Sequence, residues 1–212
     1  MPTVFGQAFL AAKRMRAELV FVAALYIASY LAGWYLISIR SPMAVQTAQG
    51  VRESVLTETP FTTISQYLRG GQLAQAILTT FVVNLTIGAF LTTTLPGVIP
   101  LVGVVGPVGV TLIRGFVVGT VYPEILASSL GGFALGFGTM ILELGAYVFS
   151  GAAGIHASLA PILPNRYGAE GRWAAFRTAW KDVVRVYVIV VILLALGAIW
   201  EMTGILLALR PS

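Results

Sequence analysis

The chain has 212 residues, of which 58% are hydrophobic and only 10% charged, and its formal net charge is +5. Soluble domains carry about 25% charged residues, so this composition excludes an ordinary soluble protein. The absence of cysteine excludes disulfides and thiol chemistry, and the single histidine, His156, excludes a multi-histidine metal site. Membrane topology explains the positive charge better than nucleic-acid binding does, because Lys and Arg gather in cytoplasmic loops.

Four long stretches of the chain contain almost no Asp, Glu, Lys or Arg. They are 19–39, 70–113, 125–165 with only Glu143, and 186–209 with only Glu201. A helix needs about 20 apolar residues to cross the hydrocarbon core, and each stretch is long enough. The sequence therefore predicts an all-α, polytopic transmembrane helix bundle that forms one membrane domain over residues 1–212.

The N-terminal segment predicts an interfacial helix followed by the first span. Residues 3–14 place Phe5 and Phe9 on one helical face beside a basic cluster, which suits a helix along the cytoplasmic interface. The next apolar run is longer than the roughly 7–15 residues of a signal-peptide core, so it predicts an uncleaved span at about 17–39. Residues 40–69 are mixed polar and predict an external segment with at least one short helix.

The second uncharged stretch has 44 residues, too many for one crossing. Pro96 and Pro100 divide it into a second span at about 72–95 and a third at about 98–121. Pro107 lies where the third span should be continuous. This span is either a Pro-kinked helix, which neighbouring helices can stabilise, or a broken or re-entrant helix that lines a cavity. We favour the kink.

The C-terminal half predicts two further spans and a second interfacial helix. A fourth span at about 125–150 ends where Gly151 loosens the helix. An amphipathic cytoplasmic helix follows at about 170–183, with aromatic residues at helical spacing and basic residues elsewhere. The fifth span covers about 184–208.

Five spans put the basic N-terminus and the basic loop at 166–185 on the same side of the membrane. These segments hold three and five Lys or Arg residues. The other side holds four: Arg40, Arg52, Arg69 and Arg210. The asymmetry predicts a multi-pass plasma-membrane protein with its N-terminus in the cytoplasm.

Three charged residues fall well inside the predicted spans, away from the span ends. Charges at such positions normally face the bundle interior and either pair or mark a transport path. The helices that carry them have small and polar residues on the same face, and the second span has a similar polar line. We predict that these faces converge on a buried polar centre. Its members are Arg114, Glu143, Glu201, Asn84, Tyr147 and Thr139.

The polar centre has two interpretations. In the structural one, Arg114 pairs with Glu143 or Glu201, and Asn84 ties helices together. In the functional one, a carboxylate binds a proton or cation during transport, because two acids facing one arginine leave a carboxylate unpaired. We interpret His156 as a satisfied polar residue near the interface rather than a proton shuttle.

The sequence lacks the usual signatures of catalysis and cofactor binding. It has no nucleophile–base pair, no metal cluster, no dinucleotide-binding glycine spacing and no phosphate-binding loop. We therefore expect no enzyme activity, cofactor, metal or nucleic-acid partner. The expected partner is the lipid bilayer.

A segment of the fourth predicted span carries a distinctive pattern. Residues 141–154 read Ile-Leu-Glu-Leu-Gly-Ala-Tyr-Val-Phe-Ser-Gly-Ala-Ala-Gly. This pattern resembles the stage II sporulation protein M family, in which a Leu-Glu pair precedes a Gly-Ala-Ala-Gly-like turn. Asn84 and the last span, which ends in Ala198-Ile-Trp-Glu201, resemble the family as well, and the similarity covers roughly 70–205. Where family members often carry His-Gly before the Leu-Glu pair, this chain has Thr139-Met140.

The resemblance implies a five-span membrane protein from a bacterium or archaeon. In spore formers the family member belongs to a complex with cell-wall hydrolases during engulfment, but homologues also occur in organisms that never sporulate. Two functions follow as hypotheses: a permease or channel for a small ion or solute, and a non-enzymatic scaffold that assembles partner membrane proteins. We expect a homodimer, for which Gly115/Gly119 or Gly132/Gly136 would provide a suitable face.

Overall fold

The computed structural model describes residues 3–208, and these residues form helices and connecting turns without a strand. Five helical segments are long and apolar enough to cross a membrane. They are α2 (Arg16–Ser38), α5 (Leu73–Val83) with its continuation to Val98, α6 (Val102–Ser128), α7 (Leu130–Leu159) and α8 (Arg172–Ala208). The predicted all-α bundle with five spans is therefore confirmed.

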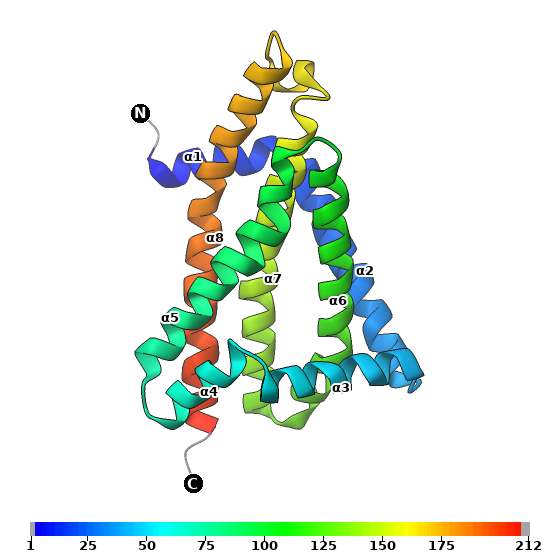
Figure 1. The fold of residues 1–212 in the computed structure, drawn as a ribbon, viewed down its shortest axis with the longest axis vertical. Coiled ribbons are helices and arrows are strands. Elements are labelled where there is room, and N and C mark those ends of the chain that lie inside the picture. The colour runs from blue at the N-terminus through cyan, green and yellow to red at the C-terminus, as the bar shows by residue number, and fades with distance from the viewer. Residues whose placement is uncertain (1–2, 209–212) are drawn as a thin grey trace.

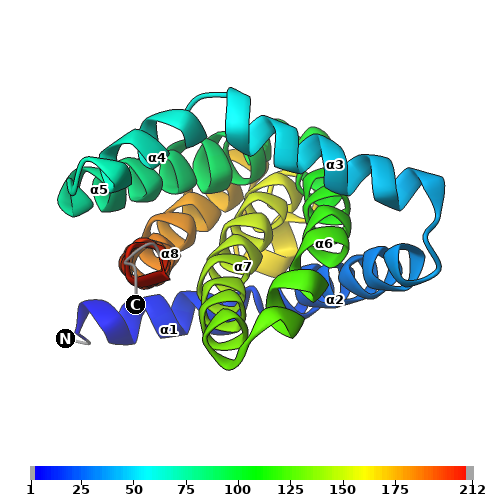
Figure 2. The same ribbon diagram turned by 90° about the horizontal axis from the view of Figure 1, so that it is seen from below.

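The spans form a layered bundle around α7. Figure 1 shows α7 between α6 and α8, with α5 crossing the bundle obliquely. Figure 2 shows that α5 lies on one side of α6, α7 and α8, while α2 lies on the other. Helix α7 contacts all the other spans, and its residues 151–158 are all buried. This helix is therefore the centre of the fold.

Three shorter helices lie across the two ends of the bundle (Figure 1). At one end, α1 (Val4–Arg14) packs Ala8 and Ala11 inward and leaves Phe5 and Phe9 exposed. At the other end lie α3 (Pro42–Thr57) and α4 (Phe61–Arg69). An exposed apolar face on a helix across the bundle end suits the membrane–water interface.

Helix α8 joins two segments that the sequence predicts separately. The predicted amphipathic helix at 170–183 and the predicted fifth span are one continuous helix, because no Gly or Pro interrupts residues 172–196. A short 3-10 helix, η3 (Pro164–Tyr167), precedes it.

Helix α7 also runs beyond the predicted end at 150. Gly154 does not loosen it, since this glycine packs directly against the backbone of the second span. A Cβ placed on Gly154 would lie only 2.0 Å from the carbonyl oxygen of Thr93. The glycine therefore allows close helix approach inside a continuous helix.

The third span is continuous, and the irregular span is the second. Helix α6 passes through Pro107 and Pro123 without a break, which corresponds to the kinked rather than the re-entrant alternative. In the second span, α5 continues as a π-helix, η1 (Asn84–Thr94), and then as a 3-10 helix, η2 (Leu95–Val98). A π-helix is rare and often marks a functional site.

The small-residue face around Gly115 and Gly119 is already filled. A Cβ on Gly119 would lie 2.2 Å from the carbonyl oxygen of Tyr30, and one on Gly33 would lie 2.3 Å from that of Phe116. These glycines let α2 and α6 approach closely. The expectation that this face is open for self-association is therefore wrong.

Candidate functional site

Glu143 lies on α7 and receives a hydrogen bond from the second span. The Nδ2 atom of Asn84 donates to Oε1 of Glu143 at 2.8 Å. Asn84 is the first residue of η1, so the change from α-helix to π-helix occurs where the chain faces this carboxylate. Asn84 thus ties the second span to α7, as its sequence position predicts.

Both glutamates of the predicted polar centre border one cavity of about 400 Å³. The cavity lies between the spans and α4, whose residues Phe61, Ile64 and Leu68 form much of its apolar wall. The structure therefore brings Glu143, Glu201 and Asn84 together around one space, although they come from three different spans.

Thr80 also borders this cavity, but its hydroxyl is not open to it. The residue is 6% exposed, and its Oγ1 is a buried atom without a hydrogen-bond partner among the described residues. The sequence places Thr80 on the polar line of the second span, together with Asn84, but not among the six predicted members of the polar centre.

Neither glutamate forms an ion pair with any Lys, Arg or His within residues 3–208. Asn84 is the only side chain there that hydrogen-bonds Glu143, and Glu201 has no such partner. An ionised carboxylate away from bulk water is costly unless it is paired. The cavity therefore has two acidic groups that form no ion pair among the described residues.

Arg114 does not pair with either glutamate. Its Nη2 donates to the carbonyl oxygen of Gly88 at 3.1 Å, and its Cζ lies 3.9 Å from the centre of the Tyr147 ring. A smaller cavity of about 170 Å³ touches both Arg114 and Glu143, so the two groups are near neighbours without direct contact. The predicted Arg–Glu pair is replaced by a cation–π contact and a backbone hydrogen bond.

The remaining predicted members occupy different positions. Tyr147 borders the smaller cavity beneath Arg114. Thr139 is 2% exposed with an unpartnered Oγ1, and it borders neither of the cavities that touch Glu143. The structure thus brings four of the other five predicted residues around Glu143 and leaves Thr139 in the helix packing one turn away.

Hydrogen bonds close the bundle beyond Tyr147. Oγ1 of Thr93 donates to Oγ of Ser150 at 2.9 Å, and Oγ1 of Thr94 donates to the Ser150 carbonyl oxygen at 2.9 Å. The Tyr187 hydroxyl then donates to Thr94 at 2.7 Å. Together with the close contact at Gly154, these bonds join η1, α7 and α8 in a tightly packed layer.

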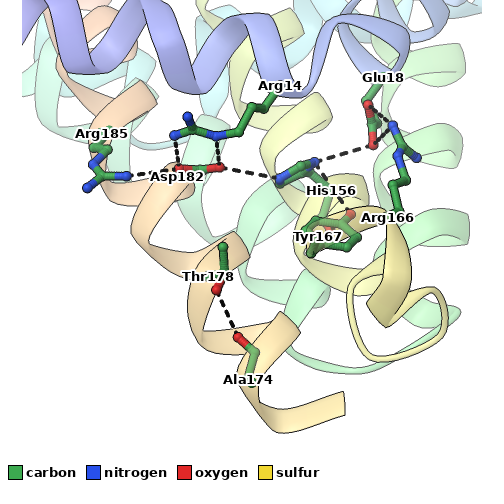
Figure 3. A network of polar contacts seen from close by, with 9 residues as sticks. All are labelled: Arg14, Glu18, His156, Arg166, Tyr167, Ala174, Thr178, Asp182 and Arg185. Carbon is green, nitrogen blue, oxygen red and sulfur yellow. Dashed lines mark hydrogen bonds and ion pairs between the residues drawn. The ribbon is translucent and has the colours of Figure 1, made fainter. Parts of the chain in front are cut away.

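A second polar cluster lies at the α1 end of the bundle, and Figure 3 shows it in detail. His156 of α7 stands between two buried acids. Its Nδ1 is 3.4 Å from Oε1 of Glu18, and its Nε2 is 3.8 Å from Oδ2 of Asp182. All three side chains are less than 5% exposed. Sequence reasoning gave neither acid a role.

Three arginines neutralise these two acids (Figure 3). Arg14 binds both oxygens of Asp182, at 2.6 Å through Nε and 2.5 Å through Nη2, and Arg185 adds a contact of 3.1 Å. Nη2 of Arg166 lies 2.9 Å from Glu18. The hydrogen bonds with Asp182 raise the pKa of Arg14, so this guanidinium keeps its charge.

The η3 turn closes over this cluster. The Tyr167 hydroxyl donates to the carbonyl oxygen of His156 at 2.6 Å, and burial raises the pKa of Tyr167. Nδ1 of His156 contacts Glu18, whereas Nε2 has no hydrogen-bond partner among the described residues. The prediction of a satisfied polar residue is therefore confirmed only in part. The sequence does contain a signal for this cluster. Glu18 is the single Glu next to the N-terminal basic run, and Asp182 is the single Asp within the basic 166–185 segment.

The comparison with known families agrees with the geometry of the spans. The sequence pattern of the family described as stage II sporulation protein M matches residues 20–203, which is more than half of the chain. The chain belongs to the stage II sporulation protein M family. Comparisons with curated proteins and with solved structures found no match.

The stage II sporulation protein M match covers the polar residues of the cavity. It includes Asn84, Glu143 and Glu201, which border the 400 Å³ cavity together. It also includes His156 and Asp182 of the second cluster, but it begins after Arg14 and Glu18. The cavity's acids thus lie entirely within the matched region, whereas the second cluster lies only partly within it.

Proposed function

We propose that this protein is a non-enzymatic permease or channel that moves a small cation across the plasma membrane of a bacterium or archaeon. The observation that carries the proposal is the pair of carboxylates, Glu143 and Glu201, on one cavity without an ion-paired cation among residues 3–208. Ionisable groups inside a membrane domain are costly, and they commonly mark ion pathways.

The cavity's surroundings support a route with one open and one closed end. The cavity lies beside α4, at the end of the bundle where α3 also lies (Figure 1). On the opposite side, the Thr93–Ser150 hydrogen bond and the close contact at Gly154 hold the helices tightly together. A transporter that binds its substrate from one side at a time requires this asymmetry.

The distribution of basic residues supports an orientation for the route. The N-terminal basic cluster and the 166–185 segment lie at the same end of the bundle (Figure 1). Arg40, Arg52 and Arg69 belong to the other end, and Arg210 lies outside the described residues. With the more basic end in the cytoplasm, the cavity beneath α4 would open to the outside.

The test is cation flux in proteoliposomes, with the wild type compared with Glu143→Gln and Glu201→Gln. Glu53→Gln is the matched control, because Glu53 is exposed on α3, outside the spans. We expect flux to fall at least tenfold in either span variant and to stay unchanged in the control. Retained flux in both span variants, with their folding verified by circular dichroism, would refute the proposal.

A scaffold that assembles partner membrane proteins is the second candidate. The observation that favours it is a groove of about 650 Å³ between α7 and α8, lined by small residues such as Gly132 and Gly204 as well as by Trp200. Small residues allow a further transmembrane helix to approach closely. An absence of flux, combined with a loss of stability in Glu143→Gln and Glu201→Gln, would favour the scaffold.

The predicted homodimer belongs with these proposals. The Gly132/Gly136 face is packed within the chain: a Cβ on Gly132 would lie 2.2 Å from Oγ of Ser128, and Gly136 packs against Ile125 and Leu126. Gly131 also borders the groove, and the nearest atom to its Cβ position is 3.9 Å away. Cross-linking in native membranes, with Gly131→Leu as the disrupting variant, measures whether the groove holds a second copy.

A further inference from the structure

We infer that the cavity between α4 and the spans binds a small organic ammonium ion, an R–NH3+ group with a short apolar body. This inference names the class of substrate for the proposed permease. The transport of that ligand rests on the proposed function. It depends on the shape and chemistry of the cavity walls, which distinguish an organic cation from an inorganic one.

The cavity offers two carboxylate acceptors to a positive group. Glu143 and Glu201 both border it, and neither forms an ion pair among residues 3–208. An ammonium group has three N–H donors and no acceptor. One ammonium could therefore donate to both carboxylates, and charge-assisted hydrogen bonds of this type are the stronger ones.

The facing wall is apolar. Phe61, Ile64 and Leu68 come from α4, and Met202 and Ile205 come from α8. A hydrated inorganic ion would place its water shell against these side chains, and Ca²⁺ would need about six to eight oxygen ligands. An alkyl group attached to the ammonium would instead bury apolar surface there.

The cavity's size also favours an organic ligand. Its volume of about 400 Å³ corresponds to about 13 water molecules at about 30 Å³ each. Cavities of about 300–1,000 Å³ with mostly apolar walls and a few polar groups are typical of small-molecule sites. Arg69 also borders the cavity, but it is exposed at the end of α4, where water and salt screen its charge.

The test is isothermal titration calorimetry of the full chain in detergent, with isopentylammonium chloride as the probe. Sodium chloride at the same concentration tests an inorganic cation, and 3-methylbutan-1-ol tests the apolar body without its charge. We expect saturable heat with the ammonium and none with either control. Glu201→Gln should lower the affinity at least tenfold, and Glu53→Gln should leave it unchanged.

Phe61→Ala keeps the test decisive if Glu201→Gln fails to fold. Phe61 lines the cavity from α4 and is 44% exposed, so its truncation should leave the fold intact. It removes part of the apolar wall that the alkyl body would contact, so the affinity for isopentylammonium should fall severalfold. Unchanged affinity in Phe61→Ala, equal binding of the alcohol, or tighter binding of sodium would each overturn the inference.

The inference and the proposed function fail in different ways. Saturable ammonium binding without flux in proteoliposomes would keep the binding site and reject the permease. Sodium or proton flux that depends on Glu143, without ammonium binding, would keep the permease and reject the organic substrate.

Discussion

Replacing Asp182 with asparagine should destabilise the protein by breaking the attachment of α1 to α8. Asp182 is 2% exposed at its side chain, and it accepts two hydrogen bonds from Arg14 and one from Arg185. Asn keeps the volume of the side chain, but it removes the charge and turns one acceptor into a donor. The variant therefore tests the charge-assisted bonds without creating a cavity.

The magnitude follows from the exposure of the partners. Hydrogen bonds to charged groups contribute about 1.5–3 kcal/mol net, and loss of a partner from a fully buried ion pair costs about 3–5 kcal/mol. The Arg14 side chain is 47% exposed, so water can replace part of what it loses. We expect the free energy of unfolding to fall by about 2 kcal/mol.

The assay is equilibrium unfolding in mixed micelles, followed by circular dichroism. Glu170→Gln is the control, because Glu170 is exposed, and it should change the free energy by less than about 0.5 kcal/mol. Arg14→Gln combined with Asp182→Asn completes a double-mutant cycle, in which the double variant should lose little more than the larger single loss. A value for Asp182→Asn within about 0.5 kcal/mol of wild type would refute the reasoning.

Three further predictions use the same unfolding measurement. Gly154→Ala should lower the free energy of unfolding by about 3 kcal/mol or more, because its Cβ would lie 2.0 Å from a backbone oxygen of η1. Gly145→Ala is the control: its nearest atom lies 3.7 Å away, so the alanine should stabilise α7 by up to about 1 kcal/mol. Equal effects of the two variants would contradict the packing explanation. Arg114→Lys should cost about 1–2 kcal/mol, since a lysine cannot stack a planar guanidinium on Tyr147, and an unchanged value would mean that the stacking contributes nothing. Arg52 forms an ion pair with Glu124, whose side chain is 73% exposed. Arg52→Gln should therefore change the free energy of unfolding by less than about 1 kcal/mol, and a larger loss would show that this surface pair is strongly coupled.

The fold class follows from the sequence because the bilayer imposes simple requirements. Long stretches without charge predict spans, and the basic segments predict which ends share a side. Boundaries near glycine were less predictable. Gly151 and Gly154 indicate a helix end when considered alone. Within α7, however, Gly154 lets the second span approach and Gly151 packs against Val22 of α2, so their role depends on the neighbouring helices.

The candidate site was predictable as a set of residues but not as a set of contacts. Helical spacing correctly indicated that Asn84, Glu143 and Glu201 approach one another, since charged and polar groups avoid lipid. It could not show that Arg114 contacts an aromatic ring and a backbone carbonyl instead of a carboxylate. The π-helix that carries the carbonyl has no clear signal in the sequence, because it results from packing between helices.

By itself, the sequence determined that this is a five-span membrane protein of the stage II sporulation protein M family, with acids inside its spans. Only the tertiary structure decided that Glu143 and Glu201 share a cavity beneath α4, and that Glu18 and Asp182 enclose His156 at the other end. The physical reason is that hydrophobicity acts locally along each span, whereas pairing between charges depends on how helices rotate and approach in three dimensions.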